Sequence, residues 1–196
     1  MSTTPRLILA STSPFRHALL ARFGLDFAAI APDCDETPLA GETAAATAQR
    51  LARDKAKSLA HAYPQALIIG SDQVALLEGQ QLGKPGTHEK AVAMLQAMRG
   101  QIVAFHTALC LFNSATGHSQ EMVDITRVVM RDYSDAQIAA YLAREPDALR
   151  CAGAAKSEGL GGALIERIES TDPNALIGLP VFALIGFLAA EGLEVL

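Results

Sequence analysis

The sequence predicts an α/β protein, because segments with the pattern of buried strands alternate with segments that have the pattern of helices. Hydrophobic residues make up 50% and charged residues 19% of the chain, which is an ordinary globular composition. Continuous apolar runs such as residues 66–69 are typical of buried strands. A chain of 196 residues is expected to form one domain over residues 1–196, and two lobes within it remain open.

The first strand and the first helix meet at a turn that can bind an anion. Leu7–Ala10 is a short apolar strand, and Ser13 and Pro14 are a typical N-cap and first residue for a helix that stops near Gly24. Helix N-termini bind phosphate. Arg16 opposes the helix dipole in the first turn, so it either faces an anion or is solvated beside a purely structural cap.

A second strand, predicted over residues 27–30, runs into a cluster of acids. The cluster contains Asp33, Asp35 and Glu36. Such a cluster is usually a solvated loop. It can equally supply a carboxylate to a divalent cation, and the sequence leaves both interpretations open.

Residues 43–63 predict a long, alanine-rich helix with Lys55 on its apolar stripe. Lys55 lies four residues from both Leu51 and Leu59, so it shares their face. A lysine on an inward face needs an anionic partner, or its ammonium must extend to water. Lys55 is therefore the most informative lysine of this helix.

Asp72 follows a predicted strand at residues 66–69 and is expected at its end. A carboxylate in such a place is costly to bury unless something uses it. Lys84 comes next, in a rigid turn between Gly83 and Pro85. One acid and one lysine delivered to the same neighbourhood are what a site for a metal-bound phosphate requires.

The second half of the chain alternates in the same way. Its glycine-rich loop at residues 151–162 allows a backbone to approach a ligand closely, although it lacks the spacing of a dinucleotide fingerprint. The other expected elements are a helix at 87–98 with Thr87 as N-cap, an antiparallel hairpin of 102–112 and 121–131 with its turn at 113–117, a helix from a capping box at Ser134 to 144, a strand at 163–168, a turn at 172–174 and a buried helix at 181–190.

Charge and cysteine content exclude several classes of protein. The net charge of −5 provides no basic field for nucleic acid. Cys34, Cys110 and Cys151 are odd in number and widely separated, which argues against a disulfide framework and suits a reducing cytosol. The uncharged stretch at 173–190 is interrupted by Gly and Pro and barely reaches membrane-spanning length, and residues 7–10 are too short for the core of a signal peptide.

Common catalytic motifs are absent from the sequence. It has no phosphate-binding loop of the Walker type, no G-x-S-x-G and no H-E-x-x-H. The five histidines have no metal-ligand spacing. What remains is acids with scattered Arg and Lys, which suits metal-assisted phosphate chemistry.

An ordered set of motifs resembles the Maf family of nucleoside triphosphate pyrophosphatases over nearly the whole chain. The motifs are LILASTSPFRHALL, DETP, the Lys55 helix, IIGSDQV, GKP, CAGAAKSEG and NALIGLP. Phe15, Gln73 and Glu158 match the branch of 7-methyl-GTP pyrophosphatases. At the position of Phe15 the usual family turn has an arginine, whereas this branch typically has an aromatic residue. The resemblance implies a Maf/ITPase-like α/β fold with a mixed twisted sheet flanked by helices, and two lobes with a central cleft.

The resemblance also implies a hydrolytic mechanism. Water attacks the α-phosphorus, Asp72 is the proton acceptor, and Glu36 and Lys55 belong to the catalytic set. Ser13, Arg16, Lys55 and Lys84 are expected to bind the phosphates. Asp72 and Glu36 are the expected ligands of a divalent cation, Mg²⁺ or Mn²⁺.

Three side chains are expected to select the base. N7-methylation gives guanine a positive charge, which the face of Phe15 would attract by roughly 0.5–2 kcal/mol. Glu158 can accept hydrogen bonds from the guanine N1–H and amino group, and Gln73 can pair with a remaining polar edge or the sugar. The alternatives are that Phe15 packs in the core and that Glu158 is a loop acid.

These inferences give a cytoplasmic enzyme with a small-molecule nucleotide as its partner. No nucleic acid and no membrane are expected, and a homodimer is left open. Two other functions also stay open: a dTTP or UTP pyrophosphatase with the same chemistry, and a nucleotide-binding regulator of cell division without turnover.

Overall fold

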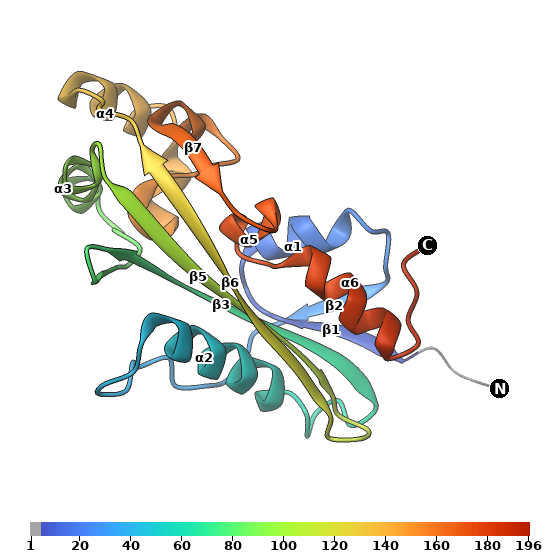
Figure 1. Cartoon of the computed structure of the whole chain (residues 1–196). Coiled ribbons are helices and arrows are strands. Elements are labelled where there is room, and N and C mark those ends of the chain that lie inside the picture. The colour runs from blue at the N-terminus through green and yellow to red at the C-terminus, as the bar shows by residue number, and fades with distance from the viewer. Residues whose placement is uncertain (1–4) are drawn as a thin grey trace. The chain divides into compact units, whose positions relative to one another are not determined.

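A computed structural model describes residues 5–196 of the chain as a mixed α/β fold (Figure 1). The strands are β1 (Arg6–Ala10), β2 (Phe27–Ile30), β3 (Ala66–Leu77), β4 (Gln80–Leu82), β5 (Ile102–Asn113), β6 (Ser119–Met130) and β7 (Ile165–Glu169). The helices are α1 (Pro14–Ala21), α2 (Ala44–Ser58), α3 (His88–Met98), α4 (Asp135–Leu142), α5 (Pro173–Ile177) and α6 (Val181–Ala190). Three 3₁₀ turns, η1 (Pro146–Arg150), η2 (Ala152–Ala154) and η3 (Leu160–Leu164), precede β7.

The strands form one seven-stranded sheet in the order β2-β1-β3-β5-β6-β7, with β4 paired to β3. β1 is parallel to both β2 and β3, whereas β4 runs antiparallel to β3 and β7 antiparallel to β6. The predicted mixed sheet with flanking helices is therefore confirmed. None of the helices in residues 5–196 combines the length and the apolar character needed to span a membrane.

The chain divides into two compact units, which we describe separately. The first unit comprises the described residues up to Gln73, together with Thr107–Asp124 and Asp172–Leu196. The second unit comprises Val74–His106 and Ile125–Thr171. The single domain and the central cleft expected from the sequence stay predictions.

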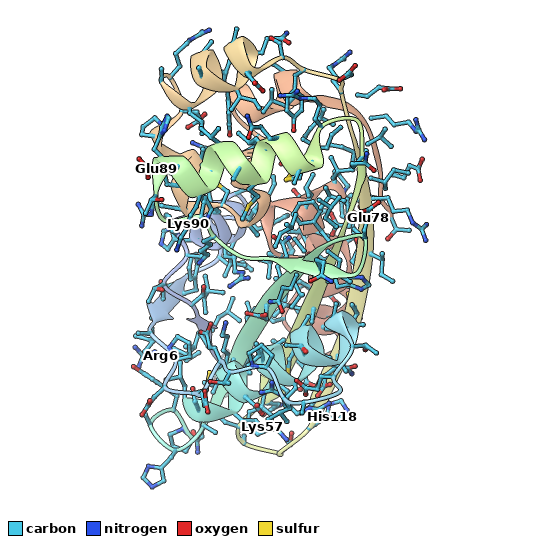
Figure 2. All side chains as sticks on the ribbon, turned by 90° about the vertical axis from the view of Figure 1, so that its left-hand side faces the viewer. Arg6, Lys57, Glu78, Glu89, Lys90 and His118 are labelled. Carbon is cyan, nitrogen blue, oxygen red and sulfur yellow. The ribbon has the colours of Figure 1, made fainter. Side chains whose placement is uncertain are left out.

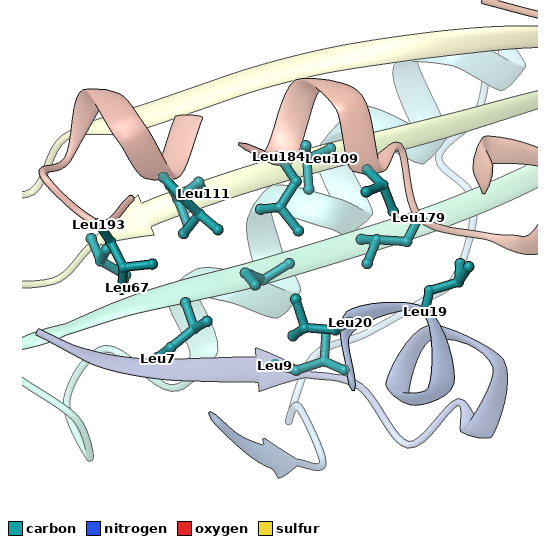
Figure 3. Packing of buried hydrophobic residues seen from close by; sticks show 13 residues of the cluster. Leu7, Leu9, Leu19, Leu20, Leu67, Leu109, Leu111, Leu179, Leu184 and Leu193 are labelled. Atoms are coloured by element: carbon teal, nitrogen blue, oxygen red, sulfur yellow. The ribbon is translucent and has the colours of Figure 1, made fainter. Parts of the chain in front are cut away.

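The first unit has its core where α1 and α6 pack on one face of β1, β3 and β5 (Figure 3). Because side chains alternate along a strand, every second residue of each strand points into this cluster. Its largest members are fully buried leucines such as Leu9, Leu20, Leu67 and Leu109. Each such side chain contributes about 1.5–3 kcal/mol to folding.

The other face of β3 packs against α2, and Gly70 permits the contact. A Cβ atom at Gly70 would overlap the carbonyl oxygen of Ala52 and come within 2.8 Å of the Ala56 nitrogen. The strand does not end at residue 69, as the apolar run suggested, but continues to Leu77. Asp72 consequently lies inside a strand of 12 residues rather than at its end.

Helix α2 is shorter than predicted. It begins after the N-cap Thr43 as expected, but ends at Ser58 instead of near Tyr63. The chain leaves the helix through turns closed by the amides of Ala60 and Tyr63. Pro64 disfavours helical geometry at Tyr63, the residue before it, but the end at Ser58 has no local explanation in the sequence.

Most elements of the second half were predicted correctly. Thr87 caps α3, Ser134 and Gln137 form the capping box of α4, and β5 and β6 flank the predicted turn. Strand β7 begins at Ile165, two residues late, and the expected turn at 172–174 opens the short helix α5, with Asp172 as its N-cap. Strand β4 and the 3₁₀ turns were not predicted.

Candidate active site

Three charged side chains of the first unit meet at one point. The Lys55 ammonium lies 2.6 Å from Oδ1 of Asp72 and 3.0 Å from Oε1 of Glu36. Lys55 and Asp72 are only 5% and 9% exposed, whereas the side chain of Glu36 is 60% exposed. The cluster therefore has a buried ion pair at its base and an exposed acid at its surface. Of the two alternatives that the sequence left open for Lys55, the structure shows the anionic partner.

The local structure explains why these groups converge. Lys55 projects from the buried face of α2, which packs against β3 at Gly70. Asp72 is two residues further along β3 than Gly70, so it faces the same helix. Of the three acids that follow β2, Glu36 is the one that contacts Lys55, while Asp35 accepts a hydrogen bond from the Thr37 amide.

Arg16 lies at the edge of the same cluster. Its Nε donates to the carbonyl oxygen of Gly178 at 2.8 Å, and one terminal nitrogen lies 3.5 Å from the Ser11 hydroxyl. Burial lowers the pKa of Arg16 from its ordinary value, while the charges of Asp72 and Glu36 act in the opposite direction. These carboxylates are therefore close enough to influence the guanidinium, as the interpretation that Arg16 faces an anion requires.

Ser13 caps α1, because its hydroxyl accepts a hydrogen bond from the Arg16 amide at 3.4 Å. The helix start that we predicted to bind phosphate is thus formed, with Arg16 in its first turn. Phe15, in the same turn, is half-buried. Its role in selecting the base and the role of Ser13 in binding phosphate stay predictions.

Gln73 faces away from Asp72, toward α5. Its side-chain nitrogen donates to the Thr107 hydroxyl at 2.9 Å and to the carbonyls of Ala175 and Leu176 at 3.0 and 3.1 Å. Ser71, on the same side of β3, places its hydroxyl 2.7 Å from the Ala108 carbonyl and 2.9 Å from that of Gly178. The backbone that follows α5 is therefore held by side chains of β3 and by Arg16.

The two predicted site residues of the second unit are on exposed loops. Lys84 is exposed, and the buried Pro85 anchors its loop. Two backbone hydrogen bonds fix this loop from outside: the Gly153 amide donates to Gly83, and the Gly86 amide donates to Leu149. Lys84 is thus presented to solvent by a segment whose backbone is held.

Glu158 is exposed in the loop between η2 and η3, and its neighbours hold that loop. The Lys156 ammonium lies 3.1 Å from Glu145 and 2.8 Å from Asp147, and these two hydrogen bonds raise its pKa. The Tyr141 hydroxyl accepts from the Lys156 amide and donates to the Ala154 carbonyl. The loop is ordered by these contacts, although Glu158 itself is at its surface.

The glycines of this loop serve its own packing. A Cβ atom at Gly161 would come within 2.5 Å of the Lys156 carbonyl oxygen, and one at Gly159 within 2.5 Å of a Glu145 carboxylate oxygen. The close approach predicted for a ligand is thus used within the loop. Gly153 has φ +72°, and Ala154 has φ +57° despite its side chain, a left-handed conformation that costs free energy.

The donor set of the Lys55 cluster fits a magnesium-type cation. One oxygen each of Asp72 and Glu36 contacts the Lys55 ammonium, and each carboxylate has a second oxygen that could bind a cation. Mg²⁺ commonly takes one or two carboxylates and completes its shell with water and substrate phosphates. Residues 5–196 contain no group of three or more His, Cys, Asp or Glu side chains placed to hold a metal, and such a cation does not need one.

Sequence reasoning missed the residues that hold the site residues in place. Ser71 and Thr107 are fully buried hydroxyls within strands, and the Tyr141 hydroxyl is buried beside the Glu158 loop. A buried hydroxyl must find a partner, so an isolated Ser or Thr in an apolar strand was the available indication. The partner itself, a carbonyl distant in sequence, has no pattern along the chain.

Comparisons with known proteins agree with the sequence motifs. A family model described as Maf-like protein matches residues 6–191. A 7-methyl-GTP pyrophosphatase of Chromobacterium violaceum is 63% identical over 97% of this chain and 98% of that relative, and one of Cupriavidus pinatubonensis is 55% identical over 96% and 94%. The solved Ham1 protein of Staphylococcus aureus is 15% identical over 65% of this chain and 72% of that chain, with a TM-score of 0.46, which is too low to establish a common fold.

Proposed function

The chain belongs to the Maf family, and from this premise we propose that it hydrolyses a nucleoside triphosphate at the α-phosphate, with 7-methyl-GTP as the preferred substrate. The products are the nucleoside monophosphate and pyrophosphate. The single observation that carries the proposal is the cluster of Lys55, Asp72 and Glu36, together with Arg16, in a chain that is 63% identical to a relative of that name. We also propose that the protein is cytoplasmic. The proposal is compatible with a monomer or a homodimer.

The first step concerns Asp72. Its Oδ1 is bound to the Lys55 ammonium at 2.6 Å, so we assign Oδ2 to the attacking water. Water attacks the α-phosphorus, its proton passes to Asp72, and the bond to the pyrophosphate oxygen breaks. Lys55 keeps the carboxylate oriented, and a positioned general base of this kind contributes about 10²–10⁴-fold to the rate.

The phosphates need positive charge in a protein whose net charge is −5. Arg16 and the free amides at the start of α1 supply it in the first unit, and Lys84 supplies a further cation. When bound, Mg²⁺ or Mn²⁺ would be held by Asp72 and Glu36 and would neutralise the charge on the phosphate oxygens. The local cations thus offset the repulsion expected from the whole chain.

Base selection is assigned to Phe15, Gln73 and Glu158. A methylated guanine carries a positive charge, which favours an aromatic face and a carboxylate over an arginine. Relatives named 7-methyl-GTP pyrophosphatase, at 63% and 55% identity, support this substrate. The neutral rings of dTTP and UTP carry no positive charge, so the same groups should attract them less strongly.

The test is a panel of purified nucleotides. We expect the protein with Mg²⁺ or Mn²⁺ to release pyrophosphate over many turnovers, with the highest kcat/KM for 7-methyl-GTP among 7-methyl-GTP, GTP, dTTP and UTP. Binding without release of pyrophosphate would identify a non-catalytic regulator. Equal or greater activity on dTTP or UTP would agree with a pyrophosphatase but would refute 7-methyl-GTP as its preferred substrate.

A further inference from the structure

Thr107 on β5 has no part in the chemistry proposed above, yet it is fully buried beside Gln73. Its hydroxyl makes two hydrogen bonds within the first unit. Oγ1 lies 2.9 Å from the Ala175 carbonyl oxygen and 2.9 Å from the side-chain nitrogen of Gln73. A threonine hydroxyl has one hydrogen to donate and lone pairs to accept with, so it can serve both partners at once.

The direction of each hydrogen bond is fixed by its partners. The Ala175 carbonyl can only accept, so Thr107 donates to it. The Thr107 oxygen then accepts from Gln73, whose nitrogen also lies 3.0 and 3.1 Å from the carbonyls of Ala175 and Leu176. All three neighbours of that nitrogen are therefore acceptors, and the reversed amide would set oxygen against oxygen.

The consequence concerns the other end of the amide. With its NH₂ group committed to the protein, Gln73 has Oε1 left to offer, and the described residues give that oxygen no hydrogen-bond partner. An amide in this state is a pure acceptor toward a ligand. It selects for an N–H donor on the base and against a lone pair at the same position.

We propose that Thr107 is a positioning residue for base selection: it locks the Gln73 amide so that its carbonyl oxygen faces the substrate. This inference rests on the proposed function and deepens it. The ligand chemistry it favours is a purine with several N–H donors on one edge, as in 7-methylguanine. Uracil and thymine offer a single N–H between two carbonyls.

The experiment uses a pair of variants that differ in one hydroxyl. Thr107→Val keeps the shape and removes the hydroxyl, whereas Thr107→Ser keeps the hydroxyl and removes the methyl group. We expect Thr107→Val to lower the ratio of kcat/KM for 7-methyl-GTP to that for UTP roughly tenfold, mainly through a higher KM for 7-methyl-GTP. Thr107→Ser should retain most of the wild-type ratio.

Gln73→Ala tests whether the two residues act together. Since Thr107 is proposed to act through Gln73, adding Thr107→Val to Gln73→Ala should lower the ratio no further. A Thr107→Val enzyme with the wild-type ratio, or one that loses the same factor on both nucleotides, would overturn the proposal. Additive losses in the double variant would do the same.

A second measurement separates this proposal from the proposed function. The side-chain amide protons of Gln73, observed by nuclear magnetic resonance in the ligand-free protein, should exchange slowly in the wild type and in Thr107→Ser. They should exchange faster in Thr107→Val, where the carbonyls of Ala175 and Leu176 are the acceptors that remain. Rapid exchange in the wild type would refute the lock, whatever the substrate. A wild type that releases no pyrophosphate or shows no preference for 7-methyl-GTP would refute the function, with the exchange data still judging the role of Thr107.

Discussion

The two units hold their charged site residues in opposite ways. In the first unit, Lys55 and Asp72 are buried and bound directly to each other, with a helix and a strand fixing both ends. In the second unit, Lys84 and Glu158 are exposed, and other residues hold the loops that carry them. In the first unit the charged groups themselves are held in place. In the second unit only the backbone that carries them is held.

This difference predicts which substitutions affect folding as well as activity. Removing one partner of a buried ion pair leaves an uncompensated charge and typically costs about 3–5 kcal/mol. Exposed charges are worth about 0–1 kcal/mol, because water and salt screen them. Substitutions of Lys55 or Asp72 should therefore change both stability and turnover, and those of Lys84 or Glu158 turnover or selectivity alone.

The largest effect is expected from Asp72→Asn. The amide cannot take the proton of the attacking water, so kcat should fall about 10²–10⁴-fold. Circular dichroism should show the fold retained, because Glu36 still pairs with Lys55. Asp54→Asn is the matched control, since Asp54 is an acid of α2 in a partly exposed pair with Arg50. Wild-type kcat in Asp72→Asn would remove this residue from the mechanism.

A comparison of two lysines tests the contrast between the units directly. Lys55→Ala should lower the free energy of unfolding by about 3–5 kcal/mol and reduce kcat, since it leaves Asp72 buried without its cation. Lys84→Ala should raise KM for every triphosphate and leave the melting temperature unchanged. Lys90→Ala is the control, because Lys90 is exposed on α3 (Figure 2). Equal effects of the first two substitutions on stability would contradict the distinction.

Two glycines provide the same contrast in packing. Gly70→Ala forces a Cβ into the α2 backbone and should cost about 1–3 kcal/mol or more, which lowers the melting temperature by roughly 2–12 °C. Gly83→Ala should change it by no more than about 1 °C, because no heavy atom lies within 4 Å of the added Cβ. Calorimetry on both variants decides, and a tolerated Gly70→Ala would mean that α2 packs less closely than described.

Selectivity should change by a smaller free energy and without loss of stability. Phe15→Arg places a cation where a charged ring is expected and should weaken 7-methyl-GTP more than UTP. Glu158→Gln leaves one guanine N–H poorly paired at a cost of about 1–3 kcal/mol, so selectivity should fall roughly 5- to 150-fold. Values of kcat/KM for 7-methyl-GTP, GTP, dTTP and UTP check both variants. Equal losses on all four nucleotides would remove these residues from base selection.

The smallest effect is expected in thiol chemistry. Burial raises the pKa of Cys34, and the charge of Lys55 acts against that rise. Lys55→Ala should therefore raise the Cys34 pKa further and slow its alkylation by iodoacetamide at pH 8, because only the thiolate reacts. Cys151 is the internal control, since burial and the nearby Glu158 raise its pKa to about 12. Faster labelling of Cys34 in Lys55→Ala would show that Lys55 does not act as a cation there.

The sequence predicted the parts of the site that follow from local rules. Ser13 could be predicted as a cap because a serine directly before a proline is a local signal for the start of a helix. Lys55 could be predicted to face inward because helical periodicity places it on the same face as Leu51. The position of Asp72 was misjudged, since Gly70 and Ser71 looked like the end of a strand. Gly70 instead lets the α2 backbone approach β3 closely, and the Ser71 hydroxyl lies 2.9 Å from the distant Gly178 carbonyl. Contacts of this kind leave no periodic trace in the chain.

The same limit applies to Gln73 and Glu158. Their identity could be noticed in the sequence, but not that Thr107 holds one and that the Lys156 loop supports the other. Hairpin β3–β4 was missed because its turn uses Glu78 at φ +48° before Gly79, where asparagine or aspartate is the usual indication. Pairing between β3 and β4 holds Glu78 in a backbone conformation that glutamate rarely adopts.

The alternation of side chains along β3 has a consequence for how such an enzyme can diversify. Asp72 points to α2, and its neighbours Ser71 and Gln73 point to the other side of the strand. In the function that we propose, hydrolysis and base selection therefore depend on opposite sides of β3. If Gln73 contacts the base as proposed, we expect substitutions at position 73 to alter the accepted base without moving Asp72. Deleting one residue between 70 and 73 would exchange the two sides at once. We therefore expect this part of β3 to tolerate substitutions that change the substrate, but not insertions or deletions.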